Sequence, residues 1–326
     1  MSETAQETAL MDAALVEARG ESPRFRQVPR PQPQPGQEVL EVLAVGVHLV
    51  TRAIAAGRHY AAGGRLPRVP GVDAVVRRAD GTLAYVATPD SGTLAQRIAV
   101  ETAAVIPMPE ADPATLAASM IPAMSSWMVL RGGVPFSGGQ SVLVIGATGT
   151  SGAIALETAR HLGAGRIIAA GRNRDRLAAL SRGVGAVQTV ALTDDREATA
   201  AALAEAAADV DVVLDYVWGP PTELALEAIL RNRADATQPL HWVQIGSLGG
   251  ESITLPAAAL RSNAIRLSGS GFGSIRFASL AQELPRLATA IAGGELSVRP
   301  RPFALADVES AWSADVVPGE RIVIIP

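Results

Sequence analysis

From about residue 140 onward, short apolar runs alternate with glycine turns and with amphipathic segments. Ser141–Gly146 is a mostly apolar run with the length of a buried strand, and Thr150–Leu162 places apolar side chains at helical spacing. The alternation predicts further strands at Arg166–Ala170, Val187–Val190, Val210–Asp215, His241–Ile245 and Ala264–Leu267, and helices at Asn173–Ser181, at Glu197–Ala207 and after Pro220 and Pro221. Six strands alternating with helices predict a doubly wound parallel sheet, the Rossmann-type α/β fold.

The first 118 residues follow a different pattern, in which short apolar runs are broken by Pro and Gly. Runs such as Val39–Val47 and Leu83–Ala87 predict the strands of a mostly β domain. The tail after Gly273 is predicted to form a helix at Ser279–Ala292 and a further strand and helix between Phe303 and Pro326, and it is too short to fold alone. We therefore expect residues 1–118 and 271–326 to form one domain and residues 119–270 to form the parallel-sheet domain.

Composition restricts the chemistry. The chain has 326 residues and no Cys, and no Lys occurs in it, so all 28 basic residues are Arg. These absences exclude disulfides, a Cys nucleophile, Cys-based zinc sites, a Schiff base and a Tyr/Lys proton relay. The net charge of −4 and the scattered Arg residues do not suggest nucleic-acid binding, and no apolar run approaches the ~18 residues of a membrane span. We expect a cytoplasmic protein that binds a small molecule.

The segment Gly146-Ala147-Thr148-Gly149-Thr150-Ser151-Gly152 lies between a predicted strand and a predicted helix. This context is typical of a dinucleotide-binding turn, in which Gly149 lets the backbone approach a diphosphate and Gly152 lets the helix pack close to the strand. The diphosphate would lie on backbone N–H groups at the helix N-terminus. The alternative is a purely structural turn.

About twenty residues further on, the next strand ends in Gly171-Arg172-Asn173-Arg174. NAD-binding proteins place an acid here for the ribose 2′-hydroxyl, whereas Gly171 leaves room for a 2′-phosphate and Arg172 supplies a cation. A charge-assisted hydrogen bond contributes roughly 1.5–3 kcal/mol, enough for a tenfold preference. The sequence therefore predicts NADP(H), with Asn173 or Arg174 assisting, unless the two Arg residues only form a solvated face.

Four segments, in order along nearly the whole chain, resemble the zinc-independent quinone oxidoreductase-like branch of the medium-chain dehydrogenase/reductase superfamily. They are Pro35-Gly36-Gln37-Glu38-Val39-Leu40, Pro70-Gly71-Val72-Asp73, Ser91-Gly92-Thr93-Leu94-Ala95 and Val142-Leu143-Val144-Ile145-Gly146-Ala147-Thr148-Gly149. The resemblance implies a GroES-like catalytic domain beside the cofactor domain. It also implies a homodimer.

The chain departs from the zinc-dependent relatives of this superfamily. They carry a Cys near the position of His48 and a Gly-His-Glu where this chain has Gly71-Val72-Asp73. One His and one Asp do not make a three-ligand catalytic zinc site, so we expect no metal. The Asn, Asp and Tyr common in the quinone oxidoreductase-like branch also appear replaced, by His48, Thr51 and Ala53.

The resemblance also implies which loops border the dinucleotide. Three segments that follow predicted strands should do so: Tyr216, Val217 and Trp218; Gly246 and Ser247; and Ser268, Gly269, Ser270 and Gly271. Ligands of open α/β sheets lie beyond the carboxyl ends of the strands, in agreement with this placement. An alternative for Trp218 is that it caps a hydrophobic patch.

Hydride transfer to a carbonyl requires a group that stabilises the developing oxyanion. A quinone or an α,β-unsaturated carbonyl spreads that charge and asks less of a protein without zinc or Lys, so we expect an NADPH-dependent reductase of such acceptors. His48, His59 and Tyr60 are the candidate proton donors. The alternatives are an NADPH-dependent reductase of one metabolic ketone or aldehyde, and a non-catalytic NADPH-binding protein.

Overall fold

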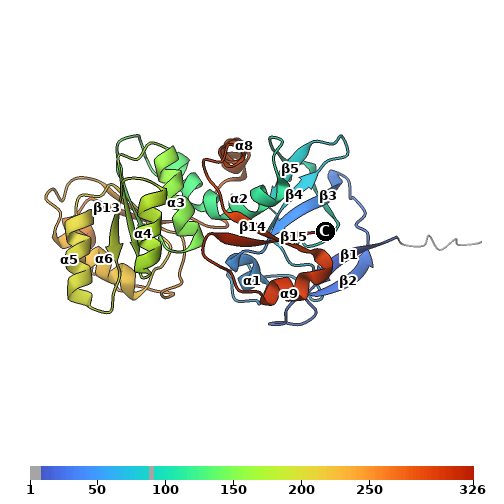
Figure 1. The fold of residues 1–326 in the computed structure, drawn as a ribbon, viewed down its shortest axis with the longest axis horizontal. Coiled ribbons are helices and arrows are strands. Elements are labelled where there is room, and N and C mark those ends of the chain that lie inside the picture. The colour runs from blue at the N-terminus through green and yellow to red at the C-terminus, as the bar shows by residue number, and fades with distance from the viewer. Residues whose placement is uncertain (1–8, 88–91) are drawn as a thin grey trace, which may run out of the picture. The chain divides into compact units, whose positions relative to one another are not determined.

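The computed structural model describes residues 9–87 and 92–326 (Figure 1), so Ser91, which opens one of the resembling segments, lies outside the described residues. By its contacts the chain divides into one unit of Met1–Ile121 with Leu284–Pro326 and another of Pro122–Glu283. These boundaries fall inside helices α2 (Pro113–Met128) and α8 (Phe277–Ala292), later than the boundaries we expect from composition at 118/119 and 270/271. A change of composition does not locate a boundary inside a helix.

The unit Pro122–Glu283 contains a parallel six-stranded sheet with the order β10-β9-β8-β11-β12-β13. Its strands are β8 (Ser141–Ile145), β9 (Arg166–Gly171), β10 (Val187–Ala191), β11 (Val212–Asp215), β12 (Leu240–Gln244) and β13 (Ile265–Gly269). The order reverses direction between β8 and β11, which makes their carboxyl ends the switch point of a doubly wound sheet. The predicted fold class is confirmed.

Helices lie along both faces of this sheet, as Figure 1 shows for α3 to α6. They are α3 (Thr150–His161), α4 (Arg174–Gly183), α5 (Arg196–Ala207) and α6 (Pro220–Arg231), followed by the short α7 (Ala257–Ser262). Alternate strand residues face opposite sides, so Val142 and Val144 pack with Leu156 of α3, whereas Leu143 packs with Leu203 of α5 and Leu226 of α6. Both faces of the central strands are therefore buried, as is typical of parallel sheets.

The other unit is built mainly from a seven-stranded sheet and a two-stranded one. The larger sheet has the order β14-β15-β3-β4-β5-β7, with β6 paired to β3, and the smaller one pairs β1 with β2. The strands are β1 (Leu10–Leu15), β2 (Arg24–Pro29), β3 (Gln37–Gly46), β4 (Asp73–Arg77), β5 (Leu83–Ala87), β6 (Arg97–Glu101), β7 (Ile106–Pro107), β14 (Arg299–Ala304) and β15 (Glu320–Ile325), and the shorter helical pieces are α1 (Leu49–Ala55), η1 (Thr102–Ala104), η3 (Leu305–Asp307) and α9 (Val308–Ser313). The C-terminal tail joins this sheet through β15, which pairs with β3.

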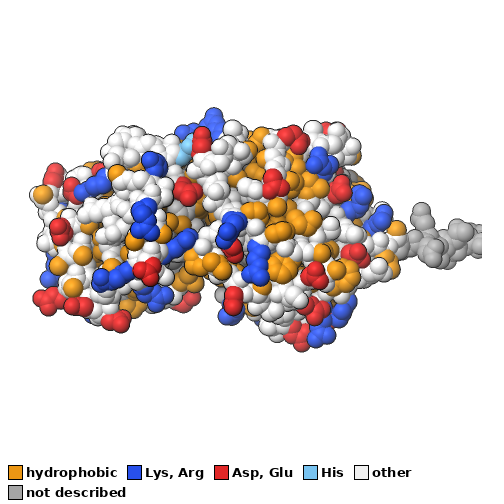
Figure 2. All heavy atoms as spheres, in the orientation of Figure 1, with side chains coloured by type: hydrophobic (Ala, Val, Ile, Leu, Met, Phe, Trp, Pro, Cys, Tyr) orange, Lys and Arg blue, Asp and Glu red, His pale blue; other side chains and the backbone are white. Residues whose placement is uncertain are grey.

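One helix passes the length and composition test for a membrane span. It covers Pro113–Gly133, where a π-helical turn at Val129–Gly133 continues α2, and 72% of its apolar window is buried inside the protein. Such burial is typical of a core helix. On the face shown in Figure 2, positive and negative side chains are interspersed, and hydrophobic ones gather over the strands of the larger sheet.

Candidate functional site

The turn between β8 and α3 has the geometry of a dinucleotide-binding turn. Gly146 has φ +90° and its N–H donates to the carbonyl of Ala170 at 2.9 Å, which fixes the end of β8 against β9. A Cβ on Gly152 would overlap the carbonyl oxygen of Gly146 and lie 2.7 Å from Cα of Ala147. Only glycine allows α3 to approach the strand this closely, so the reason inferred for Gly152 from the sequence holds in the structure.

Gly149 is different, because no neighbour crowds it. It is exposed, its φ is an ordinary −78°, and an added Cβ would make only van der Waals contact with Gly146 O at 3.5 Å. Gly149 is also the N-cap of α3 and offers no side chain to cap the helix. The approach to the helix N-terminus, bordered by the half-buried Thr148, Thr150 and Ser151, is therefore suited to an anion that the backbone can bind.

The end of β9 differs in part from the expectation. A Cβ on Gly171 would lie 2.6 Å from Cγ2 of Thr148, so the space at Gly171 is occupied by Thr148 and does not remain for a phosphate. Arg172 and Arg174 are exposed and make no hydrogen bond or ion pair with other described residues. Asn173 is the N-cap of α4 and its Oδ1 accepts from Arg176 N at 2.9 Å. The side-chain oxygen of Asn173 thus caps the start of α4, and the guanidinium groups of Arg172 and Arg174 remain for an anion.

Asp215 organises the loop that follows β11, a role that sequence reasoning missed. Its buried carboxylate accepts four hydrogen bonds: Oδ1 from Val217 N and Trp218 N at 2.9 and 3.0 Å, and Oδ2 from Thr222 Oγ1 and Trp242 Nε1 at 2.7 and 3.1 Å. Four donors compensate the desolvation of the buried group. The signal in the sequence was an acid at the end of an apolar strand.

Tyr216 belongs to the core, contrary to a direct ligand role for its side chain. Its hydroxyl lies 2.8 Å from Ser125 Oγ, and burial raises the pKa of Tyr216 to about 12. The backbone of Tyr216 still borders the turn, since added Cβ atoms on Gly146 and Gly246 would lie 3.2 Å from Tyr216 Cβ and 2.7 Å from Tyr216 O.

The two remaining loops also follow the carboxyl ends of strands. Gly246 N–H donates to Asp215 O at 3.1 Å, and the exposed Ser247 follows it. Ser268 and Gly269 end β13 and are exposed, Ser270 N–H donates to Gln244 O, and Gly271 N–H donates to Ser274 Oγ. The structure thus places all the predicted cofactor-facing segments at one edge of one sheet, where ligands of such sheets bind.

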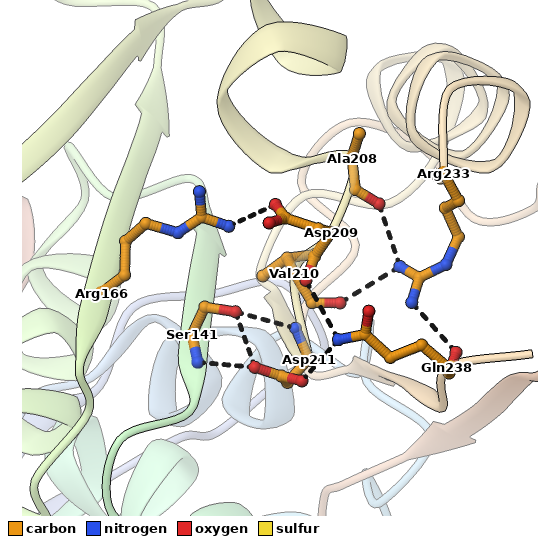
Figure 3. A network of polar contacts seen from close by, with 8 residues as sticks. All are labelled: Ser141, Arg166, Ala208, Asp209, Val210, Asp211, Arg233 and Gln238. Carbon is orange, nitrogen blue, oxygen red and sulfur yellow. Dashed lines mark hydrogen bonds and ion pairs between the residues drawn. The ribbon is translucent and has the colours of Figure 1, made fainter. Parts of the chain in front are cut away.

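The opposite edge carries a polar network of hydrogen bonds within the protein (Figure 3). Asp211 accepts from Ser141 N and Oγ at the start of β8. Arg233 donates to the carbonyls of Ala208, Val210 and Gln238. These contacts tie the amino ends of the strands together, so their role is structural.

In the other unit, His48 is 2% exposed and lies beside Asp73, with 3.4 Å between Nε2 and Oδ1. That distance is too long for a well-formed hydrogen bond of Nε2, and Nδ1 of His48 also has no hydrogen-bond partner among the described residues. Tyr85 donates to Asp73 Oδ2 at 2.9 Å, and burial raises the pKa of Tyr85 well above its usual value. Burial outweighs the attraction of Asp73 and lowers the pKa of His48, so the ring is neutral at pH 7.

Arg321 is a further charged group near His48 that the sequence did not single out. Its side chain is 5% exposed, and its buried Nε makes no hydrogen bond. Burial and the nearby Arg52 lower the pKa of Arg321 to about 10, so it remains cationic at neutral pH.

The other two donor candidates lie together at the end of the segment after α1. The rings of His59 and Tyr60 are 4.1 Å apart, and Tyr60 is 73% exposed. His59 Nδ1 accepts from Ala61 N at 3.1 Å, which leaves the proton of the neutral ring on Nε2, and partial burial lowers the pKa of His59. Within residues 9–87 and 92–326, no group of three or more His, Cys, Asp or Glu side chains is arranged to hold a metal ion.

Comparison with known proteins agrees with this arrangement. Residues 142–252 match the family described as the saccharopine dehydrogenase NADP binding domain. The chain is 29% identical to the probable NADPH-dependent quinone reductase tdiC of Emericella nidulans, over 97% of this chain and 100% of that one.

Solved structures extend the likeness to the whole fold. The quinone oxidoreductase of Thermus thermophilus, also solved with NADPH, is 26% identical with a TM-score of 0.75, covering 97% of this chain and 100% of that one. An alcohol dehydrogenase superfamily protein of Novosphingobium aromaticivorans is 23% identical with a TM-score of 0.79, covering 97% and 99%. Both match the two units together.

Proposed function

Because the chain belongs to the quinone oxidoreductase-like branch of the medium-chain dehydrogenase/reductase superfamily, we propose that it is an NADPH-dependent reductase of quinones or α,β-unsaturated carbonyls. When bound, the cofactor supplies the hydride. The observation that carries the proposal is the β8–α3 turn. Close contacts there exclude any residue larger than glycine at position 152, whereas nothing crowds Gly149 on the side from which a ligand approaches. A turn that needs glycine for packing alone would not leave the second glycine uncrowded.

The described residues fit this cofactor. The N-terminus of α3 would hold the diphosphate, and Arg172 with Arg174 would hold the 2′-phosphate, because both are exposed, cationic and without partners among the described residues. No acid lies at the end of β9 to favour the 2′-hydroxyl of NADH. The backbones of Tyr216, Gly246 and Ser270 would border the other half of the molecule.

The acceptor follows from the groups that the chain lacks. Without Lys or Cys, no Tyr/Lys pair and no Cys-held zinc can stabilise a localised alkoxide, so a conjugated acceptor that delocalises the charge is favoured. We assign proton donation to His59 or Tyr60, which are accessible, and a positioning role to His48, which is buried and neutral. Of these residues, only the accessible ones can meet a substrate atom.

The test is NADPH oxidation, followed with a naphthoquinone, a simple enone and a simple aldehyde as acceptors. The proposal expects turnover of the quinone or the enone to exceed that of the aldehyde. Faster turnover of the aldehyde would support the ketone/aldehyde reductase, and NADPH binding without any turnover would support a non-catalytic role. Replacement of Tyr60 by Phe and of His59 by Gln then identifies the donor through loss of kcat.

We also propose that the protein is a cytoplasmic homodimer. β13 is an edge strand whose residues are exposed after Ile265, and three exposed leucines lie on it or in the segment that leads from β12 to it: Leu248, Leu260 and Leu267. An unpaired edge beside apolar side chains favours pairing with a second copy. Light scattering should give the dimer mass for the wild type and the monomer mass for Leu267→Glu, whereas Leu10→Glu, at the exposed first residue of β1, leaves the dimer intact. A monomeric wild type would refute the pairing.

A further inference from the structure

Trp218 has a backbone conformation that large residues rarely adopt. Its φ is +58°, and it is the one non-glycine residue with positive φ in the part of the chain that the structure describes. Left-handed backbone crowds a Cβ and is disfavoured for bulky side chains, whereas glycine adopts it freely. Such residues persist only where their surroundings impose them, and they concentrate at functional sites.

The surroundings of Trp218 impose this conformation. Asp215 Oδ1 accepts from the N–H groups of Val217 and Trp218, which closes the turn directly after β11. Gly249 packs against the turn so closely that an added Cβ would lie 2.6 Å from Trp218 O. The hydrogen bonds of the turn do not require an indole, because glycine at position 218 would satisfy them without strain. The side chain therefore needs a reason other than this turn.

The position of Trp218 in the sheet indicates that reason. β11 lies beside β8 at the switch point, with Arg172 at the end of β9 on one side and Gly246 after β12 on the other. If Arg172 holds the 2′-phosphate, the β11–β13 side receives the half of the dinucleotide that carries nicotinamide. Trp218 is half-buried and, unlike Val217, belongs to neither of the two core clusters that cover this sheet.

We propose that Trp218 is a specificity-determining residue that stacks its indole on the nicotinamide ring of the bound cofactor. This inference rests on the proposed function and adds a residue to it. An indole provides a large flat surface for a planar heterocycle, and the oxidised ring carries a positive charge that an aromatic face attracts. The strain at residue 218 is thus tolerated in exchange for ligand binding.

The test compares ligands that contain or lack the nicotinamide half. Trp218→Gly, Trp218→Phe and Arg172→Ala are titrated with NADP⁺, NADPH and adenosine 2′,5′-bisphosphate, and their melting temperatures are measured. We expect Trp218→Gly to weaken NADP⁺ about tenfold, NADPH less, and the bisphosphate not at all. Its melting temperature should stay or rise, because glycine relieves the strained φ. Trp218→Phe should retain most of the affinity, and Arg172→Ala should weaken all three ligands.

Three results would overturn the inference. Equal losses for all three ligands, or no loss for any, would show that the indole does not contact the nicotinamide half. A lower melting temperature of Trp218→Gly would show that the indole is there to stabilise the fold. If the wild type itself binds none of the ligands, the proposed function fails, and that outcome is distinct from binding that is insensitive to Trp218.

Discussion

The two inner glycines of the β8–α3 turn should respond differently to the same substitution. Gly152→Ala places a Cβ against the backbone of Gly146 and Ala147, which has no flexible end that can move aside. Gly149→Ala places a Cβ in van der Waals contact with one atom at 3.5 Å, on the side from which a ligand approaches. The first change should therefore reduce stability, and the second should reduce cofactor affinity.

The magnitudes follow from the contacts. Overpacking costs about 1–3 kcal/mol, and the rigid backbone met at Gly152 places this change in the upper part of that range, about 2–3 kcal/mol. The gain of helix propensity from Gly to Ala offsets about 1 kcal/mol, so Gly152→Ala should lose about 1–2 kcal/mol. For a unit of this size that lowers the melting temperature by roughly 2–8 °C. Gly149→Ala alters an N-cap and should cost under about 1 kcal/mol of stability. It should weaken NADPH about tenfold to a hundredfold, since it displaces the diphosphate from charge-assisted hydrogen bonds.

Calorimetry without ligand and NADPH titration by fluorescence measure the two effects separately. Gly183→Ala is the matched control, because Gly183 lies in α4, has ordinary φ and would meet no atom within 4 Å. It should raise stability slightly and leave NADPH affinity unchanged. The reasoning fails if Gly152→Ala is as stable as the control, or if Gly149→Ala binds NADPH like the wild type.

Three further predictions concern other parts of the molecule. Arg172→Ala should weaken NADPH at least about tenfold and leave NADH unchanged, and equal losses would reject the 2′-phosphate assignment. Arg233→Ala should lower the free energy of unfolding by about 1–3 kcal/mol because three carbonyls lose their donor, with NADPH affinity unchanged, since the network lies at the amino ends of the strands. Burial lowers the pKa of His48 from 6.5, so the unfolded chain binds the proton more readily and stability should fall as the pH drops below about 6.5. Measured by urea unfolding between about pH 7 and pH 5, the free energy of unfolding should depend less on pH in His48→Gln than in the wild type.

The sequence predicted the parallel sheet well because each of its strands carries its own local signal. The helix predicted from Asn173 is observed, with Asn173 as its N-cap, and so is the helix opened by Pro220. The predicted strand His241–Ile245 differs from β12 by one residue at each end. The π-extended α2 was missed because its apolar face has no clear period and Pro122 lies inside it. Tertiary burial stabilises that helix, and no local pattern reports burial.

The candidate site was predictable to the extent that it is built from backbone. The order strand, glycine turn, helix determines where N–H groups point, so the β8–α3 turn could be inferred from the residues alone. Gly171 shows the limit of such prediction, because Thr148, whose side chain fills the space beside Gly171, lies more than twenty residues earlier in the chain. The four hydrogen-bond donors to Asp215 come from three segments, and no spacing in the sequence predicts that they meet.

The acceptor side depends on contacts of another kind. His48 follows the end of β3, Asp73 opens β4 and Tyr85 lies on β5, so the antiparallel pairing of three strands brings this buried group together. The pairing of β3 with β4 even shifts register between Val42 and Ala44, which no alternation pattern reports. Side chains placed by such pairings can change from one relative to the next without altering the cofactor turn. The choice of cofactor can therefore be predicted from contiguous residues, whereas the choice of acceptor has to be measured. For this reason the comparison of acceptors and the ligand series at Trp218 test different parts of the same proposal.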